Sequence, residues 1–197
     1  DRVVIASGTS GAIPSYFDSA IGGAGANPLA SLGAGHKKIM KGEPILVDIV
    51  HVHRGYITDM TRMFSVGKPD EIWIERLEQM EEIATKVKNS LSNGDTCSKA
   101  WEIGHTMSEN MGLSEHLMGM PPEQSRFLGH SIGLELDETP VVAFGFDTPL
   151  DIGGTMAIEP KVIFPDGAVG IEDCWYRDEY GLQCLSSGNS FPSWTEW

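Results

Sequence analysis

Two aspartates are spaced so that a β-hairpin would bring their carboxylates together. Asp48 follows one short apolar stretch, and Asp59 lies within the next. If His53 and Arg54 form the turn, the two aspartates are directly opposite, with Cβ atoms roughly 4.5–5.5 Å apart. If Arg54 and Gly55 form the turn, the aspartates become diagonal neighbours on the same face of the sheet. Like charges so close destabilise a hairpin unless a cation neutralises them, and a divalent metal ion would do so.

Two glutamates repeat this arrangement across a second predicted turn. Glu159 and Glu172 are directly opposite if Pro165 and Asp166 form the loop, although a bulge at Gly167 would shift this register. Both glutamates lie within apolar stretches, where carboxylates are rarely buried without a partner. The second hairpin therefore offers a second pair of acidic side chains for binding cations.

A histidine adds the nitrogen ligand that such a site needs. His130 stands next to Gly129 in an apolar, glycine-flanked stretch, which lets a neutral imidazole approach a metal ion closely. Four carboxylates and one imidazole suit Mn²⁺, Fe²⁺, Co²⁺ or Zn²⁺ better than copper, with manganese preferred. Another interpretation stays open: the acids are solvated strand residues or ion-pair partners of Arg62 and Lys161, and His130 is structural.

The elements that must position these residues are expected in the order strands, two helices, strands. Residues 3–6 predict a first strand, and a long glycine-rich loop follows. An apolar stripe over residues 71–92 predicts a helix that ends at Asn93-Gly94. Thr96 is expected to cap a second helix, which closes at Gly112. The later strands are expected at residues 141–146, 155–164 and 168–176. This order indicates an α+β domain.

The composition is typical of a globular domain with its own core. Of the 197 residues, 41% are hydrophobic and 21% are charged. A net charge of −14 argues against nucleic acid or an anionic membrane as partner. Three cysteines (Cys97, Cys174 and Cys184) are too few and scattered for a disulfide framework, which favours a cytoplasmic location. The chain begins with Asp1, and we expect a single catalytic domain over residues 1–197. Either an upstream segment is missing from this domain, or another element covers the side of the sheet that such a segment would cover.

Four short motifs resemble, in order, the signatures of the pita-bread metallopeptidases. This family includes aminopeptidase P, prolidase and methionine aminopeptidase, with creatinase as a metal-free relative. The motifs are VD at 47–48 with GYITDMTR at 55–62, GHSIGL at 129–134, IEP at 158–160 and GIED at 170–173. The resemblance covers residues 3 to 185, and its character is that of the branch that acts on proline peptides.

The resemblance implies a pseudo-twofold α+β fold, in which an antiparallel sheet carries helices on its outer face. It also implies two divalent metal ions. Asp48 would chelate one ion, Asp59 and Glu172 would bridge both, and His130 and Glu159 would complete the second. A hydroxide between the ions would be the nucleophile, its pKa lowered by the metals. Glu159 would carry a proton to the leaving nitrogen.

Three positions depart from the family pattern. Ser15 stands where the peptidases usually have a histidine, and Asp137 replaces a second histidine, seven residues after the metal-binding one. Both histidines bind substrate in the family, so Asp137 becomes a candidate catalytic acid beside His130 and Glu159. Gly170 stands where the proline-specific enzymes often have an arginine next to the carboxylates. The metal ligands are therefore retained while the substrate contacts differ.

These observations favour a dinuclear metal-dependent hydrolase that cleaves short peptides of the Xaa-Pro type. Two alternatives stay open. One is a non-peptide C–N hydrolase or lyase acting on a small zwitterion, and the other is a catalytically silent binding module. The helices that usually precede the first strand of the family are not predicted from this sequence. A sheet face left exposed in this way would favour a homodimer.

Overall fold

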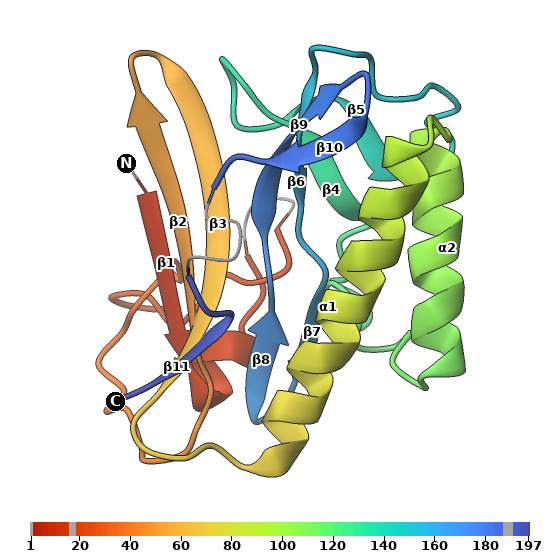
Figure 1. Ribbon diagram of the computed structural model, residues 1–197. Coiled ribbons are helices and arrows are strands. Elements are labelled where there is room, and N and C mark those ends of the chain that lie inside the picture. Colours follow the sequence, from red (N-terminus) through yellow and green to blue (C-terminus); the bar gives the residue numbers. More distant parts are fainter. Residues whose placement is uncertain (1, 16–18, 187–190) are drawn as a thin grey trace.

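The computed structural model describes residues 2–15, 19–186 and 191–197, and it confirms the α+β class (Figure 1). Strands come first, two α-helices follow, and the remaining strands complete the chain. The elements are β1 (Arg2–Ser7), the 3₁₀ helix η1 (Gly8–Ala12), β2 (Ile45–His53), β3 (Tyr56–Ser65), α1 (Glu71–Ser92), α2 (Cys97–Asn110), β4 (Phe127–Ser131), β5 (Glu138–Ala143), β6 (Thr155–Ile158), β7 (Lys161–Phe164), β8 (Gly167–Gly170), β9 (Asp173–Asp178), β10 (Gly181–Cys184) and β11 (Trp194–Glu196).

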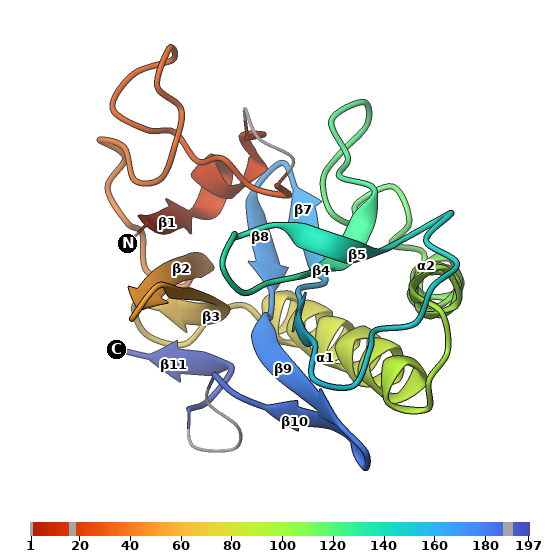
Figure 2. The ribbon, with the colours of Figure 1, turned by 90° about the horizontal axis from the view of Figure 1, so that it is seen from above.

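The strands form two sheets and a separate hairpin. The first sheet has the order β1-β2-β3-β11 and the second has the order β10-β9-β6-β4-β5, while β7 pairs with β8. The two views place the first sheet on one side of the β7–β8 hairpin, and α1 and α2 on the other side (Figures 1 and 2). One buried apolar cluster connects these layers. Among its members are Leu46, Met63, Leu77, Met80, Ile83, Val87, Met156, Val162 and Val169.

The β2–β3 hairpin adopts the second of the two expected registers. Its turn residues are Arg54 and Gly55, whose φ angles are 53° and 88°. Positive φ at both central residues matches the twist of the flanking strands, and glycine adopts it without strain. The first expected turn, at His53 and Arg54, is therefore wrong, because His53 belongs to β2. Asp48 and Asp59 are diagonal neighbours rather than directly opposite.

The β7–β8 hairpin has the expected register, but its strands are shorter than predicted. Lys161 pairs with Gly170, and the chain turns at Pro165 and Asp166. The predicted strand 155–164 divides into β6 and β7 at Pro160, which has no N–H to continue a ladder. The predicted strand 168–176 is also divided, into β8 and β9, at Ile171 and Glu172. Each break moves the chain between the second sheet and the hairpin.

The two helices begin and end close to where the sequence predicts. The Oγ1 atom of Thr96 accepts a hydrogen bond of 3.1 Å from the amide of Lys99, which caps α2 as expected. Gly112 follows α2 with a φ angle of 71°, the left-handed conformation that glycine tolerates. In the part of the chain that the structure describes, no helix is long and apolar enough to cross a membrane.

The two sheets are joined at a buried arginine. The side chain of Arg62, on β3, is 3% exposed and forms an ion pair of 2.6 Å with Asp173 on β9. Its Nη1 atom also donates to the backbone oxygens of Thr61 and Glu172, both at 2.8 Å. Thr61 and Glu172 form a β-bridge beside it. Arg62 therefore fixes the position of Glu172, and hence of its carboxylate, relative to the first sheet.

We expect Arg62→Met to lower the free energy of unfolding by about 3 kcal/mol. In this variant the largely buried carboxylate of Asp173 and the backbone oxygens of Thr61 and Glu172 lose the guanidinium group that donates to them. Denaturant unfolding of both proteins measures the difference. Lys99→Met is the matched control, since its ion pair with Glu102 is exposed and should contribute at most about 1 kcal/mol. Equal losses in the two variants would contradict a structural role for Arg62.

Candidate metal centre

Three of the five expected metal ligands meet at one point between the sheets. Asp59, His130 and Glu172 each offer a ligand atom, and these atoms all lie within 4.8 Å of one another. Their exposures are 6%, 4% and 1%, so all three side chains are buried. They come from β3, β4 and the link between β8 and β9. Residues far apart in the sequence are thus brought together by the pairing of the two sheets.

Two carboxylate oxygens of this cluster are suited to binding a cation. Within the described ranges, Asp59 Oδ1 and Glu172 Oε1 are buried and have no hydrogen-bond partner. Buried acceptors are nearly always satisfied, because leaving one unpaired has a large desolvation cost. Glu172 Oε2, in contrast, accepts from the hydroxyl of Thr61 at 2.8 Å. The two unpaired oxygens and the nearby imidazole are the kind of donor set that a divalent ion binds.

The raised pKa values of two carboxyl groups in the cluster also indicate a site for a cation. Burial raises the pKa of Asp59 to about 11, and the charges of Glu172, Asp48 and Glu159 add to this effect. Burial, together with Glu159, raises the pKa of Glu172 to about 7. Without a bound metal, Asp59 therefore keeps its proton at neutral pH and Glu172 does so in part. A divalent ion would replace these protons, as metal binding to acidic sites does.

Glu159 and His130 form a second pair beside this point. Glu159 Oε1 lies 3.4 Å from His130 Nε2. Burial by itself would raise the pKa of Glu159, but Lys161 and His130 outweigh it and lower the value to about 2. Burial opposes charge on His130, yet the hydrogen bond to Glu159 and the neighbouring carboxylates raise its pKa to about 9. A metal ion would have to displace that proton, because only neutral imidazole binds metals.

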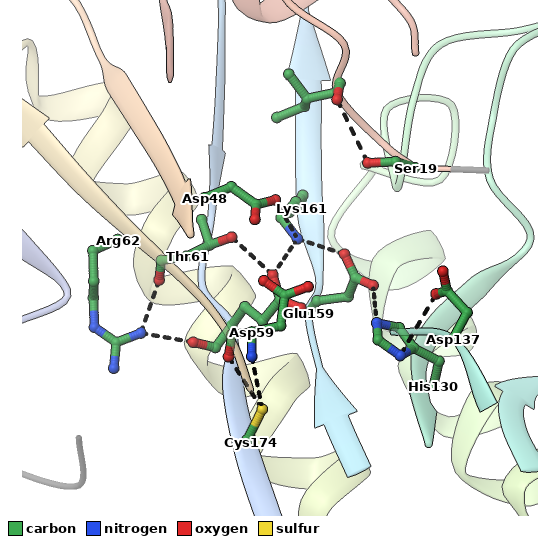
Figure 3. A network of polar contacts seen from close by, with 12 residues as sticks. Ser19, Asp48, Asp59, Thr61, Arg62, His130, Asp137, Glu159, Lys161 and Cys174 are labelled. Atoms are coloured by element: carbon green, nitrogen blue, oxygen red, sulfur yellow. Dashed lines mark hydrogen bonds and ion pairs between the residues drawn. The ribbon is translucent and has the colours of Figure 1, made fainter. Parts of the chain in front are cut away.

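A lysine lies inside the cluster, among three of its carboxylates (Figure 3). The Nζ atom of Lys161 is 2.5 Å from Glu159 Oε2, 2.9 Å from Glu172 Oε2 and 3.9 Å from Asp48 Oδ2. Burial opposes its charge, but these three carboxylates hold its pKa well above the usual value. Asp48 is thus brought to the cluster beside an ammonium group, and its side chain remains 16% exposed.

Lys161 is a component of the site that the motif comparison misses. From the sequence, Lys161 was considered only as an ion-pair partner of the acids, in the alternative to a metal site. Lys161 does form ion pairs with Glu159 and Glu172. One signal was present: Lys161 follows Glu159 by two residues, and in an extended chain such residues point to the same side. Arg62, the other cation named there, pairs with Asp173 instead.

The positions that depart from the family pattern differ in their distance from the centre. Asp137 Oδ1 lies 3.6 Å from His130 Nδ1, and its side chain is 65% exposed. The backbone oxygen of Ser131 lies 3.1 Å from the same nitrogen. Ser15 is half-buried in the loop after η1, and its role stays a prediction. At Gly170, a Cβ atom would lie 2.3 Å from the Cγ atom of Lys161, so the lysine stem fills the space of a side chain there.

The match to known proteins covers most of the chain. The model of metallopeptidase family M24 matches residues 2–179. The chain is 30% identical over 165 residues to the Xaa-Pro dipeptidase of Pyrococcus horikoshii, which covers 83% of this chain and 45% of that protein. It is 28% identical over 178 residues to the Xaa-Pro dipeptidase of Pyrococcus furiosus, with coverage of 90% and 49%. The chain thus spans about half the length of these curated relatives.

The structure is also similar to solved structures of related enzymes. It matches the X-Pro aminopeptidase from Thermotoga maritima with a TM-score of 0.81 and 22% identity, over 100% of this chain and 49% of that chain. It matches the prolidase from Pyrococcus horikoshii with a TM-score of 0.76 and 27% identity, over 95% and 48%. These similarities confirm the expected pita-bread fold. Together with the match over residues 2–179, they show that the chain belongs to metallopeptidase family M24.

Proposed function

We propose that this chain is the catalytic domain of a metal-dependent hydrolase that cleaves short peptides of the Xaa-Pro type. The observation that carries the proposal is the buried cluster of Asp59, His130 and Glu172, in which two carboxylate oxygens have no hydrogen-bond partner among the described residues. Membership of a metallopeptidase family supports peptide hydrolysis as the reaction at this cluster. The names of the curated relatives support the choice of Xaa-Pro substrates.

The number and identity of the metal ions are part of this proposal. The resemblance predicts two ions, with manganese preferred, held by all five ligands. The geometry supports most directly the ion that Asp59, His130 and Glu172 would hold. The position that Asp48 and Glu159 would help to form stays a prediction, because the ammonium group of Lys161 lies between them.

Each part of the centre has a task in peptide hydrolysis. A bound divalent ion would polarise the scissile carbonyl and activate water. Glu159 is buried at the edge of the cluster beside His130, and from this position it would carry a proton to the leaving nitrogen. The backbone oxygen of Ser131, 3.1 Å from His130 Nδ1, can orient the imidazole, and the carboxylate of Asp137 lies 3.6 Å from the same nitrogen.

One observation favours a second candidate function. Asp137 presents an exposed carboxylate beside the centre, at the position where the family peptidases usually have a substrate-binding histidine. A carboxylate there would attract the cationic end of a small zwitterion. A C–N hydrolase or lyase acting on such a compound is therefore the alternative reaction. A silent binding module is less well supported, because the cluster at Asp59 retains its unpaired oxygens.

A homodimer and a cytoplasmic location remain predictions. Val3 and Ile5 of β1 are 47% and 37% exposed, and Val52 of β2 is 44% exposed. Apolar side chains left open on a sheet of this kind are typical of a surface that another chain or segment covers. Measurement of the oligomeric state in solution would show whether a second copy of the chain covers this surface.

We expect the purified protein to bind a divalent metal ion through Asp59. Asp59→Asn removes the charge of a ligand while keeping its shape, so it should weaken Mn²⁺ binding by at least about 100-fold, more than changes outside the ligand set typically do. Titration with Mn²⁺ followed by elemental analysis measures this. Asp151→Asn, at an exposed loop position, is the control and should bind as the unchanged protein does. Failure of the unchanged protein to bind any metal would exclude the proposed mechanism.

The substrate class is tested with a panel of dipeptides. The metal-loaded protein should hydrolyse dipeptides with proline in the second position faster than matched dipeptides with alanine there. A chelator should abolish the activity, and Glu159→Gln should reduce kcat by about 10²–10⁴ because the proton carrier is lost. Glu102→Gln, on the exposed side of α2, is the control. Release of ammonia or an alkene from small zwitterions, with no dipeptide cleaved, would favour the second candidate instead.

A further inference from the structure

The strongest unexplained feature of the centre is the position of its lysine. Lys161 is 2% exposed, and its ammonium group contacts the carboxylates of Glu159 and Glu172 at 2.5 and 2.9 Å, with Asp48 at 3.9 Å. These three acids are members of the ligand set that the resemblance assigns to two metals. The lysine therefore occupies space in which a second metal ion would have to lie (Figure 3).

The hairpin is built so that this lysine can enter the centre. Lys161 is the first residue of β7 and pairs directly with Gly170 of β8. A Cβ atom at Gly170 would lie 2.3 Å from Cγ of Lys161 and 2.8 Å from its Cβ. It would also lie 2.9 Å from the Cα atom of Lys161, so the close pairing of the two strands at this point requires glycine. Gly170 thus leaves room for the backbone of Lys161 and for the first atoms of its side chain.

The oxygens of the centre divide into two groups. Glu159 Oε2 and Glu172 Oε2 already bind the ammonium group. A metal ion on these same oxygens would need contacts of roughly 2.0–2.2 Å, which would place it against a positive charge. Asp59 Oδ1 and Glu172 Oε1, in contrast, have no hydrogen-bond partner among the described residues, and the side chains that carry them form a cluster with His130. One group of oxygens is satisfied by the lysine, and the other is left for a metal.

We propose that Lys161 supplies one of the two cations of this centre, so that the protein binds a single divalent ion at Asp59, His130 and Glu172. The ammonium group takes the place of the second ion and neutralises Asp48, Glu159 and the other oxygen of Glu172. This proposal rests on the proposed function for the presence of a metal, but it differs from it in the number of ions. The substitution of a side chain for an ion needs no change in the five ligands.

The test is a count of bound metal in three proteins. The unchanged protein and Lys161→Ala are stripped of metal, saturated with Mn²⁺, freed of excess ion and analysed for manganese per chain. We expect one equivalent in the unchanged protein and two in Lys161→Ala, because alanine frees the oxygens and the space. Lys37→Ala is the matched control: it also removes a lysine from an ion pair, with Glu43 at 2.6 Å, and should keep one equivalent.

A second measurement covers the case in which Lys161→Ala folds poorly. Without metal, this variant leaves three carboxylates without their ammonium partner, so its Tm should fall below that of the unchanged protein. Saturating Mn²⁺ should then raise its Tm by more than it raises that of the unchanged protein, because a second ion binds the folded state. If the variant cannot be purified at all, the count in the unchanged protein still decides between one ion and two.

Each outcome has one meaning. Two equivalents in the unchanged protein would overturn the role of Lys161 and leave the proposed function intact, since the lysine would then move aside for the second ion. One equivalent in both proteins would overturn it too, because removal of the lysine would free no site. No metal in the unchanged protein would overturn both this inference and the metal mechanism on which it rests.

Discussion

The burial of four carboxylates in one place is the constraint on which the rest of this structure depends. Asp59, Glu159 and Glu172 are each at most 6% exposed, and Asp48 lies next to them. Like charges at this density cannot all remain ionised without cations among them. Protons or cations must therefore neutralise part of this charge, and among the described residues Lys161 supplies one such cation. The unpaired oxygens of Asp59 and Glu172 show where this supply is incomplete.

The pairing of the strands fixes the positions of these acidic side chains. In the β2–β3 hairpin, Asp48 and Asp59 point to the same side because of the register that the turn at Arg54 and Gly55 sets. A shift by one residue on either strand would turn one aspartate to the opposite face. Arg62 then holds the first sheet to the backbone of Glu172. The charge cluster and the contact between the sheets therefore share the residue Glu172.

Local patterns predict the helices and the β7–β8 register, whereas the clustered acids were named by the four motifs that resemble the family. The apolar stripe of residues 71–92 and the cap at Thr96 are properties of neighbouring residues. The strands around Glu159 were harder to predict, since the break at Pro160 depends on which sheet the chain joins next. Short strands such as β4 and β11 were missed because few residues carry their pattern and their partners are distant.

The family motifs did not place Lys161 in the centre, for a different physical reason. A signature names the residues that bind a metal, but the number of cations depends on which positive groups can reach the same oxygens. That reach is set here by Gly170, a residue on the opposite strand whose lack of a side chain leaves room for the lysine stem. Under the proposed role of Lys161, a chain that keeps all five ligands binds one ion fewer, because an ammonium group already contacts the carboxylates of Glu159 and Glu172.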